Sequence, residues 1–437
     1  MRAPFIYILV LVAVGSPGLL KFGTAATSDV GLFNLSSVTR IAFYVLAGYA
    51  LVLFYLAERL RGHSRPANSF AGLRLAVAIY GYFLVTTVAS VSGTPLLLAV
   101  YRICEWFLLV VAIFAATPST VYASRATAED HVTKILMLAL SLPPIIVLIG
   151  FIVVPDMAVE PAEPFGRLGG WIYGPNGFGA TCGMGCVLFW TLSRSWLGKA
   201  WSVVLLGCLF LSYSRGAYIG FLASVIIGVA LQRTPRMRAH HWALVALCGA
   251  LVFLVYDGRA LLEFLSRGQS VSQLLTLNSR TFIWEAAVKT LVDNWLWGKG
   301  FVVGPRELGQ HLYEWVQPST AHNEILNAMV AGGVLAGGLV LALYVVLVRD
   351  VLLAPFGEPH RQAYAMVAVQ AVVYSTITPS LSATVGVVSA AVLILVRHAA
   401  RLRECTAGDP VPARPPGFGG QVSAGSPGSE ATPGRYP

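Results

Sequence analysis

The chain has 437 residues, of which 56% are hydrophobic and only 11% are charged. Soluble globular proteins carry about 25% charged residues, so the composition excludes a soluble domain and predicts an all-α, polytopic membrane protein. The formal net charge is +10. The basic residues form short clusters between apolar runs, where they orient a chain in a membrane, so we do not expect nucleic acid as a partner.

Apolar windows of about 17 to 25 residues mark the expected membrane-spanning helices. They predict about twelve spans, near residues 4–20, 38–57, 73–92, 95–116, 134–154, 175–192, 199–214, 216–232, 242–257, 321–348, 363–378 and 382–398. The first could instead be a cleaved signal peptide, because Arg2 precedes a short apolar core and Ala25 and Ala26 would suit a cleavage site. We favour a retained span.

The predicted spans divide the chain into four parts. Nine spans lie within residues 1–257, a long loop follows at 258–320, and three more spans lie within 321–403. Residues 404–437 are rich in Pro, Gly and Ser, so we expect a disordered cytoplasmic tail. In the long loop, the stretches Leu261 to Leu275 and Arg280 to Trp295 have apolar residues at helical spacing and predict helices that lie on the membrane surface. In the second, the residues expected to share one face are Ile283, Ala287, Thr290 and Leu291.

The basic loops predict which side of the membrane each connection faces. Short connections rich in Lys and Arg, such as those containing Arg59 and Arg236, alternate with short connections that carry few basic residues and with the 258–320 loop, which is basic but long enough that the bias applies to it only weakly. Because short basic loops stay in the cytoplasm, we expect the 155–174 segment, the turn at Arg215 and the long loop to face the periplasm. The sequence thus predicts a multi-pass membrane protein with these connections on the periplasmic, or exterior, side.

Four polar motifs fall on this expected periplasmic side. They are Tyr173-Gly174-Pro175-Asn176-Gly177, Ser212-Tyr213-Ser214-Arg215-Gly216, Ser279-Arg280 and His322-Asn323-Glu324. The search for spans did not select them, so their placement on one side favours a shared site.

Arg215 and Arg280 are the candidate anion-binding residues. Arg215 lies in a turn too short to reach far into water, and a guanidinium there can bind phosphate oxygens through two hydrogen bonds. Arg215 could instead anchor its helix by reaching to the interface, and Arg280 could be an ordinary solvated arginine. Because both face the compartment that we expect to hold His322, we favour the functional interpretation.

His322 is the candidate general base, since an unperturbed imidazole titrates near pH 6.5 and can accept a hydroxyl proton. A structural histidine is the alternative. Asn323 and Glu324 add hydrogen-bonding groups at the first turn of the following helix, and we expect them to contact substrate, although Glu324 could simply favour the helix dipole. Further along, we interpret Gly332, Gly333, Gly337 and Gly338 as small residues that let a neighbouring helix approach.

Three further polar residues are candidates for substrate binding. Arg102 and Glu105 are spaced to pair on one face of the fourth span, either as a structural ion pair or as part of the lining of a substrate cavity. Asn176 follows Pro175 at the start of a span, where a structural cap is the alternative. No cysteine pair has metal-ligand spacing and the eight histidines are scattered, so we expect neither a metal nor a cofactor.

Taken together, these motifs resemble the bacterial O-antigen ligases and the related polysaccharide polymerases. The resemblance covers about residues 134 to 348 and rests on Pro175-Asn176, Ser214-Arg215-Gly216-Ala217, Ser279-Arg280 with Trp284, Trp297-Gly298-Lys299-Gly300, and His322-Asn323 followed by Gly332-Gly333. A proline often precedes the Gly-x-Gly element in that family. This chain has Asn294-Trp295-Leu296-Trp297 there.

The resemblance implies a glycosyltransferase of GT-C-like architecture that transfers a glycan from undecaprenyl pyrophosphate to a sugar hydroxyl of the lipid A core. Arg215 and Arg280 would stabilise the departing pyrophosphate without a metal, and His322 would deprotonate the acceptor, so that the displacement inverts the anomeric carbon. A polymerase of the same family is the first alternative. A flippase or transporter for lipid-linked glycans is the second, although transporters place their sites near the membrane midplane.

Overall fold

The computed structural model describes residues 71–115, 125–161, 166–232, 280–308, 320–382 and 386–408, together with positions 242 and 246. The spans expected at 4–20 and 38–57, all but two residues of the span expected at 242–257, the helix expected at Leu261 to Leu275 and the tail beyond Gly408 lie outside these residues.

Helices form at the other expected spans. Their bounds are α3 Ala71–Ser90, α4 Thr94–Ala115, α5 Arg125–Val153, α8 Pro175–Leu192, α9 Trp196–Leu211, α10 Arg215–Ala230, α16 Glu324–Leu353, α17 Glu358–Ser375 and α18 Val387–Gly408. Two helical stretches, Glu129–Val153 and Glu324–Leu353, are long and apolar enough to cross a membrane, and shorter apolar helices accompany them. These helices indicate a membrane protein. The number of spans stays a prediction.

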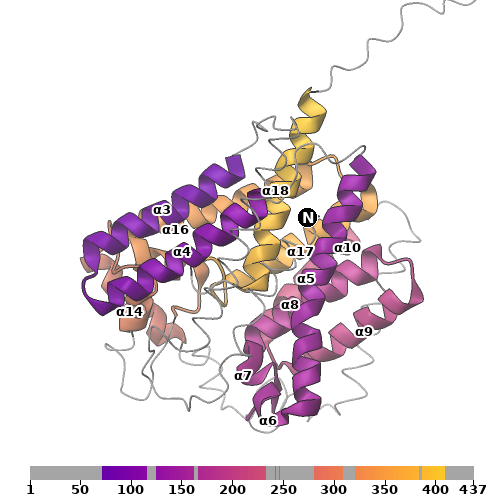
Figure 1. Ribbon diagram of the computed structural model, residues 1–437, viewed down its shortest axis with the longest axis horizontal. Helices are drawn as coiled ribbons and strands as arrows, with labels where there is room; N and C mark the ends of the chain where they lie inside the picture. The colour runs from indigo at the N-terminus through magenta and orange to yellow at the C-terminus, as the bar shows by residue number, and fades with distance from the viewer. Residues whose placement is uncertain are drawn as a thin grey trace, which may run out of the picture.

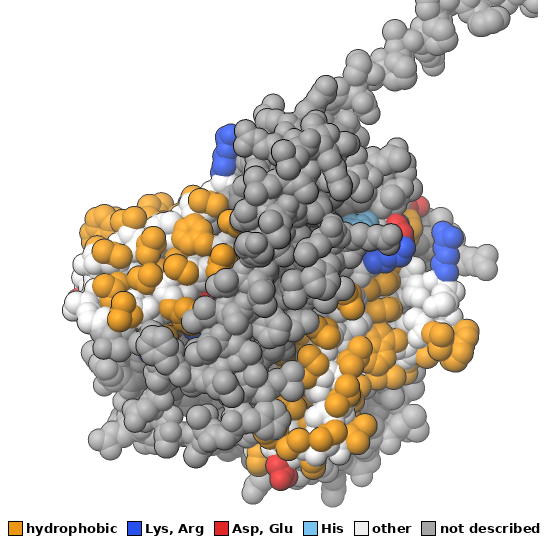
Figure 2. All heavy atoms as spheres, in the orientation of Figure 1, with side chains coloured by type: hydrophobic (Ala, Val, Ile, Leu, Met, Phe, Trp, Pro, Cys, Tyr) orange, Lys and Arg blue, Asp and Glu red, His pale blue; other side chains and the backbone are white. Residues whose placement is uncertain are grey.

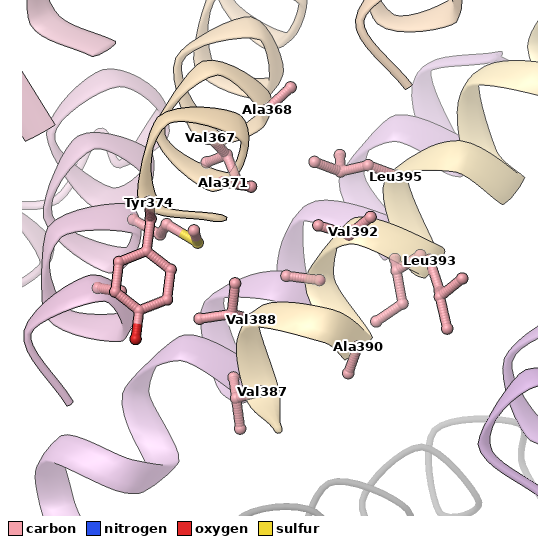
Figure 3. Close-up of a cluster of buried hydrophobic side chains, with 14 of the residues drawn as sticks. Val367, Ala368, Ala371, Tyr374, Val387, Val388, Ala390, Val392, Leu393 and Leu395 are labelled. Carbon is pink, nitrogen blue, oxygen red and sulfur yellow. The ribbon is translucent and has the colours of Figure 1, made fainter. Parts of the chain in front are cut away.

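Figure 1 shows two groups of helices joined through α17 and α18. Helices α3 and α4 pack with α16 in one group, and α5, α8, α9 and α10 pack together in the other. Helix α17 lies against α8, α10 and α16, while α18 contacts α16, α4 and α5. The central pair presents mainly alanine and valine to each other, including Val367, Ala371, Val388 and Val392 (Figure 3). Small side chains let these two helices fill the centre of the bundle.

The outer faces of the helices are apolar. Figure 2 shows hydrophobic side chains gathered over α3 and α4 and again over α5 and α9. Val85 and Val88 of α3, Ile149 of α5 and Val203 of α9 are among the exposed apolar side chains of these helices. Lipid is the solvent that suits such surfaces, because a large exposed apolar area is unfavourable in water.

Short elements fill the connections expected on the periplasmic side. Between α5 and α8 lie α6 Pro155–Ala158, β1 Val159–Glu160, β2 Arg167–Leu168 and α7 Gly170–Tyr173. The strands pair antiparallel, with Val159 opposite Leu168. The described chain is mostly helical, as expected, and this hairpin of two-residue strands is too short to predict from alternation. Further along, α14 Arg280–Asp293 and α15 Val303–Glu307 pack on α16.

Helix α14 confirms the predicted helix and its buried face. Ile283 and Ala287 are buried against Ala321 and Val330, with Leu291 packed beside them. The side chain of Thr290 donates to the carbonyl of Ala286.

Three sequence expectations need correction in this region. Helix α16 begins at Glu324, not at residue 321, and α18 begins at Val387 and continues to Gly408, five residues into the expected tail. Gly332 and Gly333 do more than let a neighbouring helix approach. Both have non-helical backbone angles and break α16. Phe83 of α3 does approach Gly332, whereas Gly338 has no neighbour within 4 Å of its Cβ position.

Candidate active site

Four helices begin at the same end of the bundle as the candidate residues. Asn176 is in the first turn of α8, Arg215 is the first residue of α10, Arg280 is the first residue of α14, and His322 lies two residues before α16. Direct contacts join these helix ends, as described below. Helix N-termini carry partial positive charge and free N–H groups, so their convergence favours an anion.

The turn that presents Arg215 is held by its own serines. Ser214 caps α10, its Oγ accepting from the backbone N of Ala217 at 3.4 Å, and Ser212 Oγ accepts from Ser214 N at 3.3 Å. Tyr213 between them has φ 50°. At Gly216 a Cβ would lie 2.9 Å from Cγ2 of Ile377, so only glycine lets this turn pack on the end of α17. In the Ser-Arg-Gly-Ala motif, Ser214 and Gly216 therefore shape the turn, and Arg215 supplies the charge.

Arg215 and Arg280 lie close enough to repel each other. Burial lowers the pKa of Arg280, and the positive charge of Arg215 lowers it further. Both arginines open a helix that has no acidic residue in its first turn, where the helix dipole also disfavours a cation. An anion bound between the two guanidinium groups would offset the cost of burying a charge, the repulsion between the two arginines and the unfavourable helix dipole.

His322 is half-buried near Arg280. Its pKa is lowered to about 4, first because burial disfavours the imidazolium and second because of the charge of Arg280. Its Nδ1 is buried and has no hydrogen-bond partner among the residues that the structure describes. The imidazole is therefore neutral at pH 7 and can accept a proton.

The backbone of His322 is held in the left-handed region, with φ 51°. On one side, Ala321 donates its N–H to Oδ1 of Asn327 at 2.9 Å and accepts from Nε1 of Trp284 at 3.0 Å. On the other side, Asn323 caps α16 by accepting from Leu326 N at 3.0 Å. A non-glycine residue with positive φ persists where its surroundings impose it. Trp284 thus connects α14, which begins at Arg280, to the residue beside His322.

Asn323 and Glu324 fasten this segment to the region after α17. Asn323 donates from Nδ2 to the carbonyl of Thr376 at 3.2 Å. Glu324 is 1% exposed, and its carboxylate accepts from the backbone N–H groups of Ser380, Leu381 and Ser382 and from the hydroxyl of Tyr344. Glu324 was expected to contact substrate. With its oxygens occupied and shielded, it instead positions the 380–382 segment against the start of α16.

Arg167 is a component that the sequence reasoning missed. Its guanidinium donates to Oδ1 of Asn176 at 2.8 Å, to Oε2 of Glu160 at 3.1 Å and to the carbonyl of Ser212 at 3.3 Å. It therefore links the hairpin, the start of α8 and the turn before Arg215. The only available signal was its place in the 155–174 segment. Asn176 fixes Arg167 through its side-chain oxygen, which favours the structural alternative for this residue.

Arg102 and Glu105 form the ion pair that their spacing predicted, with Nη1 and Oε2 2.7 Å apart. Tyr101 donates to the same carboxylate at 2.8 Å. The charge of Arg102 lowers the pKa of Arg306 in α15, after the larger effect of burial. This ion pair is thus linked electrostatically to α15. The structural ion pair is the interpretation that these contacts favour.

Within the described ranges, no three His, Cys, Asp or Glu side chains gather so that they could hold a metal ion. Residues 200–341 match the family model described as O-Antigen ligase. This match includes Arg215, Arg280 and His322. A search of curated proteins found no match. The resemblance to the O-antigen ligases predicted from the motifs is confirmed over residues 200–341, the segment that carries the three candidate catalytic residues.

Proposed function

We propose that the protein is a glycosyltransferase that moves an O-antigen glycan from undecaprenyl pyrophosphate to a sugar hydroxyl of the lipid A core. We place the reaction at the periplasmic face of the bacterial inner membrane, in a multi-pass protein of about twelve spans with GT-C-like architecture. The observation that carries this proposal is the neutral, half-buried imidazole of His322 near Arg280, which in turn lies close enough to Arg215 for their charges to interact.

In the proposed step, the imidazole of His322 takes the proton of the acceptor hydroxyl as its oxygen forms a bond to the anomeric carbon. The bond from that carbon to the pyrophosphate oxygen breaks, and its electron pair leaves with the pyrophosphate. Arg215 and Arg280 stabilise the negative charge that develops on the leaving group. The acceptor attacks opposite the leaving group, so the configuration inverts. The family and the candidate residues call for no metal ion in this step.

Binding of the donor would also improve His322 as a base. In the free protein, burial and, to a smaller extent, the charge of Arg280 keep the pKa of the imidazole low, at about 4. A pyrophosphate between the arginines offsets that charge and raises the pKa toward neutrality, where general bases are most effective. The base would therefore strengthen when the donor is in place.

The polymerase alternative uses the same donor and the same three residues, with the growing glycan as acceptor. Purified protein in liposomes, given a polyprenyl-pyrophosphate glycan with either lipid A core or a second donor molecule, separates the two reactions. Glycosylated lipid A core is the product expected of a ligase, and a lengthened lipid-linked glycan is that of a polymerase. Translocation of intact donor with neither product would support the flippase alternative and refute transfer.

A further inference from the structure

The segment Asn294 to Gly300, which follows α14, exposes three large apolar side chains in a row. Trp295 is 61% exposed, Leu296 41% and Trp297 50%. The site described above does not use any of them. In water such a patch would be unfavourable, so the position of this segment relative to the apolar surface of the helices decides what it contacts.

Hydrogen bonds place this segment beside the middle turns of two apolar helices. The carbonyl of Trp295 accepts from Val334 N of α16 at 2.8 Å, and the carbonyl of Leu296 accepts from the hydroxyl of Tyr82 of α3 at 3.0 Å. At 1.5 Å per residue, Gly332 lies about 12 Å along α16 from Glu324. Tyr82 lies about as far from the nearer end of α3.

Exposed apolar side chains of both helices lie close in sequence to the residues that bind this segment. In α16 no residue between Glu324 and Gly333 is exposed, whereas Val334 and Leu335 are. Val85 and Val88 are exposed on α3 between Tyr82 and the end of the helix. The three side chains of the segment therefore continue the exposed apolar surface of α3 and α16.

The backbone of the segment is suited to a water-poor environment. Besides the two carbonyls above, Lys299 N donates to the carbonyl of Val330 at 2.8 Å, and Gly300 N donates to that of Ala331 at 2.9 Å. Phe301 N donates to Oγ1 of Thr87 at 2.8 Å. Non-helical backbone is tolerated near lipid only where its polar groups are paired within the protein.

The break in α16 makes this pairing possible. Gly333 has φ 76°, and a Cβ there would lie 2.0 Å from the carbonyl oxygen of Leu296. A Cβ on Gly298 would lie 2.6 Å from the backbone N of Gly332. Glycines on both sides thus let the segment enter the gap that the break opens in the hydrogen-bond ladder of α16.

We propose that Trp295, Leu296 and Trp297 form an interfacial membrane anchor, seated at the boundary between headgroups and acyl chains of the leaflet on the side of the candidate site. Tryptophan is enriched at that boundary because its ring is apolar and its N–H is polar. Glu285 and Lys289, which are exposed on α14 and paired at 2.9 Å, would stay among the headgroups. The anchor fixes one end of α14 in the bilayer, while Trp284 holds the other end near His322.

The test uses the full-length, unmodified protein in liposomes whose phospholipid carries a photoactivatable diazirine on the acyl chain. After irradiation, mass spectrometry maps the lipid adducts to peptides. We expect adducts on Trp295 to Trp297 at a level comparable to those on Val334 and Leu335. The Glu285 to Lys289 stretch of α14 serves as the control on the same helix and should carry few or none.

Two results would overturn the proposal. One is labelling of Val334 and Leu335 with none on Trp295 to Trp297, which would mean that protein or water covers the segment. The other is equal labelling of the Glu285 to Lys289 control, since the whole helix would then lie in the acyl region. Neither result depends on transferase activity, so this proposal and the proposed function can fail separately.

Discussion

The charge of Arg280 should be measurable through the pKa of His322. In the folded protein that pKa is about 4, against about 6.5 for an unperturbed histidine. The difference corresponds to about 3 kcal/mol of disfavoured imidazolium. Burial is the larger cause and Arg280 the smaller. Arg280→Gln should therefore recover less than half of the difference and raise the pKa of His322 to roughly 5.

Diethyl pyrocarbonate reports this pKa without any need for activity, because it modifies only the neutral imidazole. The rate of modification of His322, followed by peptide mapping, should stay level in the wild type as the pH falls from 7 to about 5. In Arg280→Gln it should begin to fall at a higher pH. Arg280→Lys, which keeps the charge, is the matched control and should resemble the wild type.

The same titration tests whether binding of the donor pyrophosphate raises the pKa of His322. Inorganic pyrophosphate bound between Arg215 and Arg280 should shift the fall in modification rate of the wild type to higher pH. An identical pH dependence in wild type and Arg280→Gln would refute the electrostatic coupling. The idea that the donor strengthens the base would then lose its support.

The remaining predictions concern geometry as well as charge. Arg215→Lys keeps the charge but loses the paired donors, and transfer in liposomes should fall at least about tenfold; full activity would contradict bidentate recognition of the pyrophosphate. Gly333→Ala should destabilise the protein by about 2 kcal/mol or more, since its Cβ would meet the carbonyl of Leu296 at 2.0 Å and its φ is 76°. Gly338→Ala, with open space around it, should be neutral or slightly stabilising in the same thermal unfolding measurement, and equal effects of the two would argue against the break in α16. Glu324→Gln replaces an acceptor of backbone N–H groups by a partial donor, so the melting temperature should fall by several degrees; an unchanged value would mean that the carboxylate does not hold the 380–382 segment.

The apolar helices could be predicted from the sequence because their signal is local. Helix α8 spans Pro175–Leu192, as expected, and α3, α4 and α10 lie within two residues of the predicted bounds. Continuous apolar runs between basic turns leave little freedom in where such helices begin. The placement of Arg215, Arg280 and His322 at one end of the bundle also followed, since it depends mainly on the alternation of connections.

The contacts that shape the site could not be predicted in this way. Arg167 donates hydrogen bonds to Asn176 and to Ser212. No pattern in the sequence indicates either contact. Glu324 precedes an apolar run and suited a substrate contact, yet its partners lie more than 50 residues away at 380–382. The role of Gly333 depends on the loop at Leu296, which meets it only in the folded chain. In each case the role of the residue depends on a contact with a residue far away in the sequence.

The central claim is that His322 removes the acceptor proton during glycosyl transfer. The most direct measurement is the single-turnover rate of purified protein in liposomes, with lipid-linked glycan and lipid A core, for the wild type and for His322→Ala. Loss of a general base should lower that rate by about 100-fold or more, while the variant keeps its fold and its pyrophosphate binding. Transfer by His322→Ala at a rate close to that of the wild type would contradict the account.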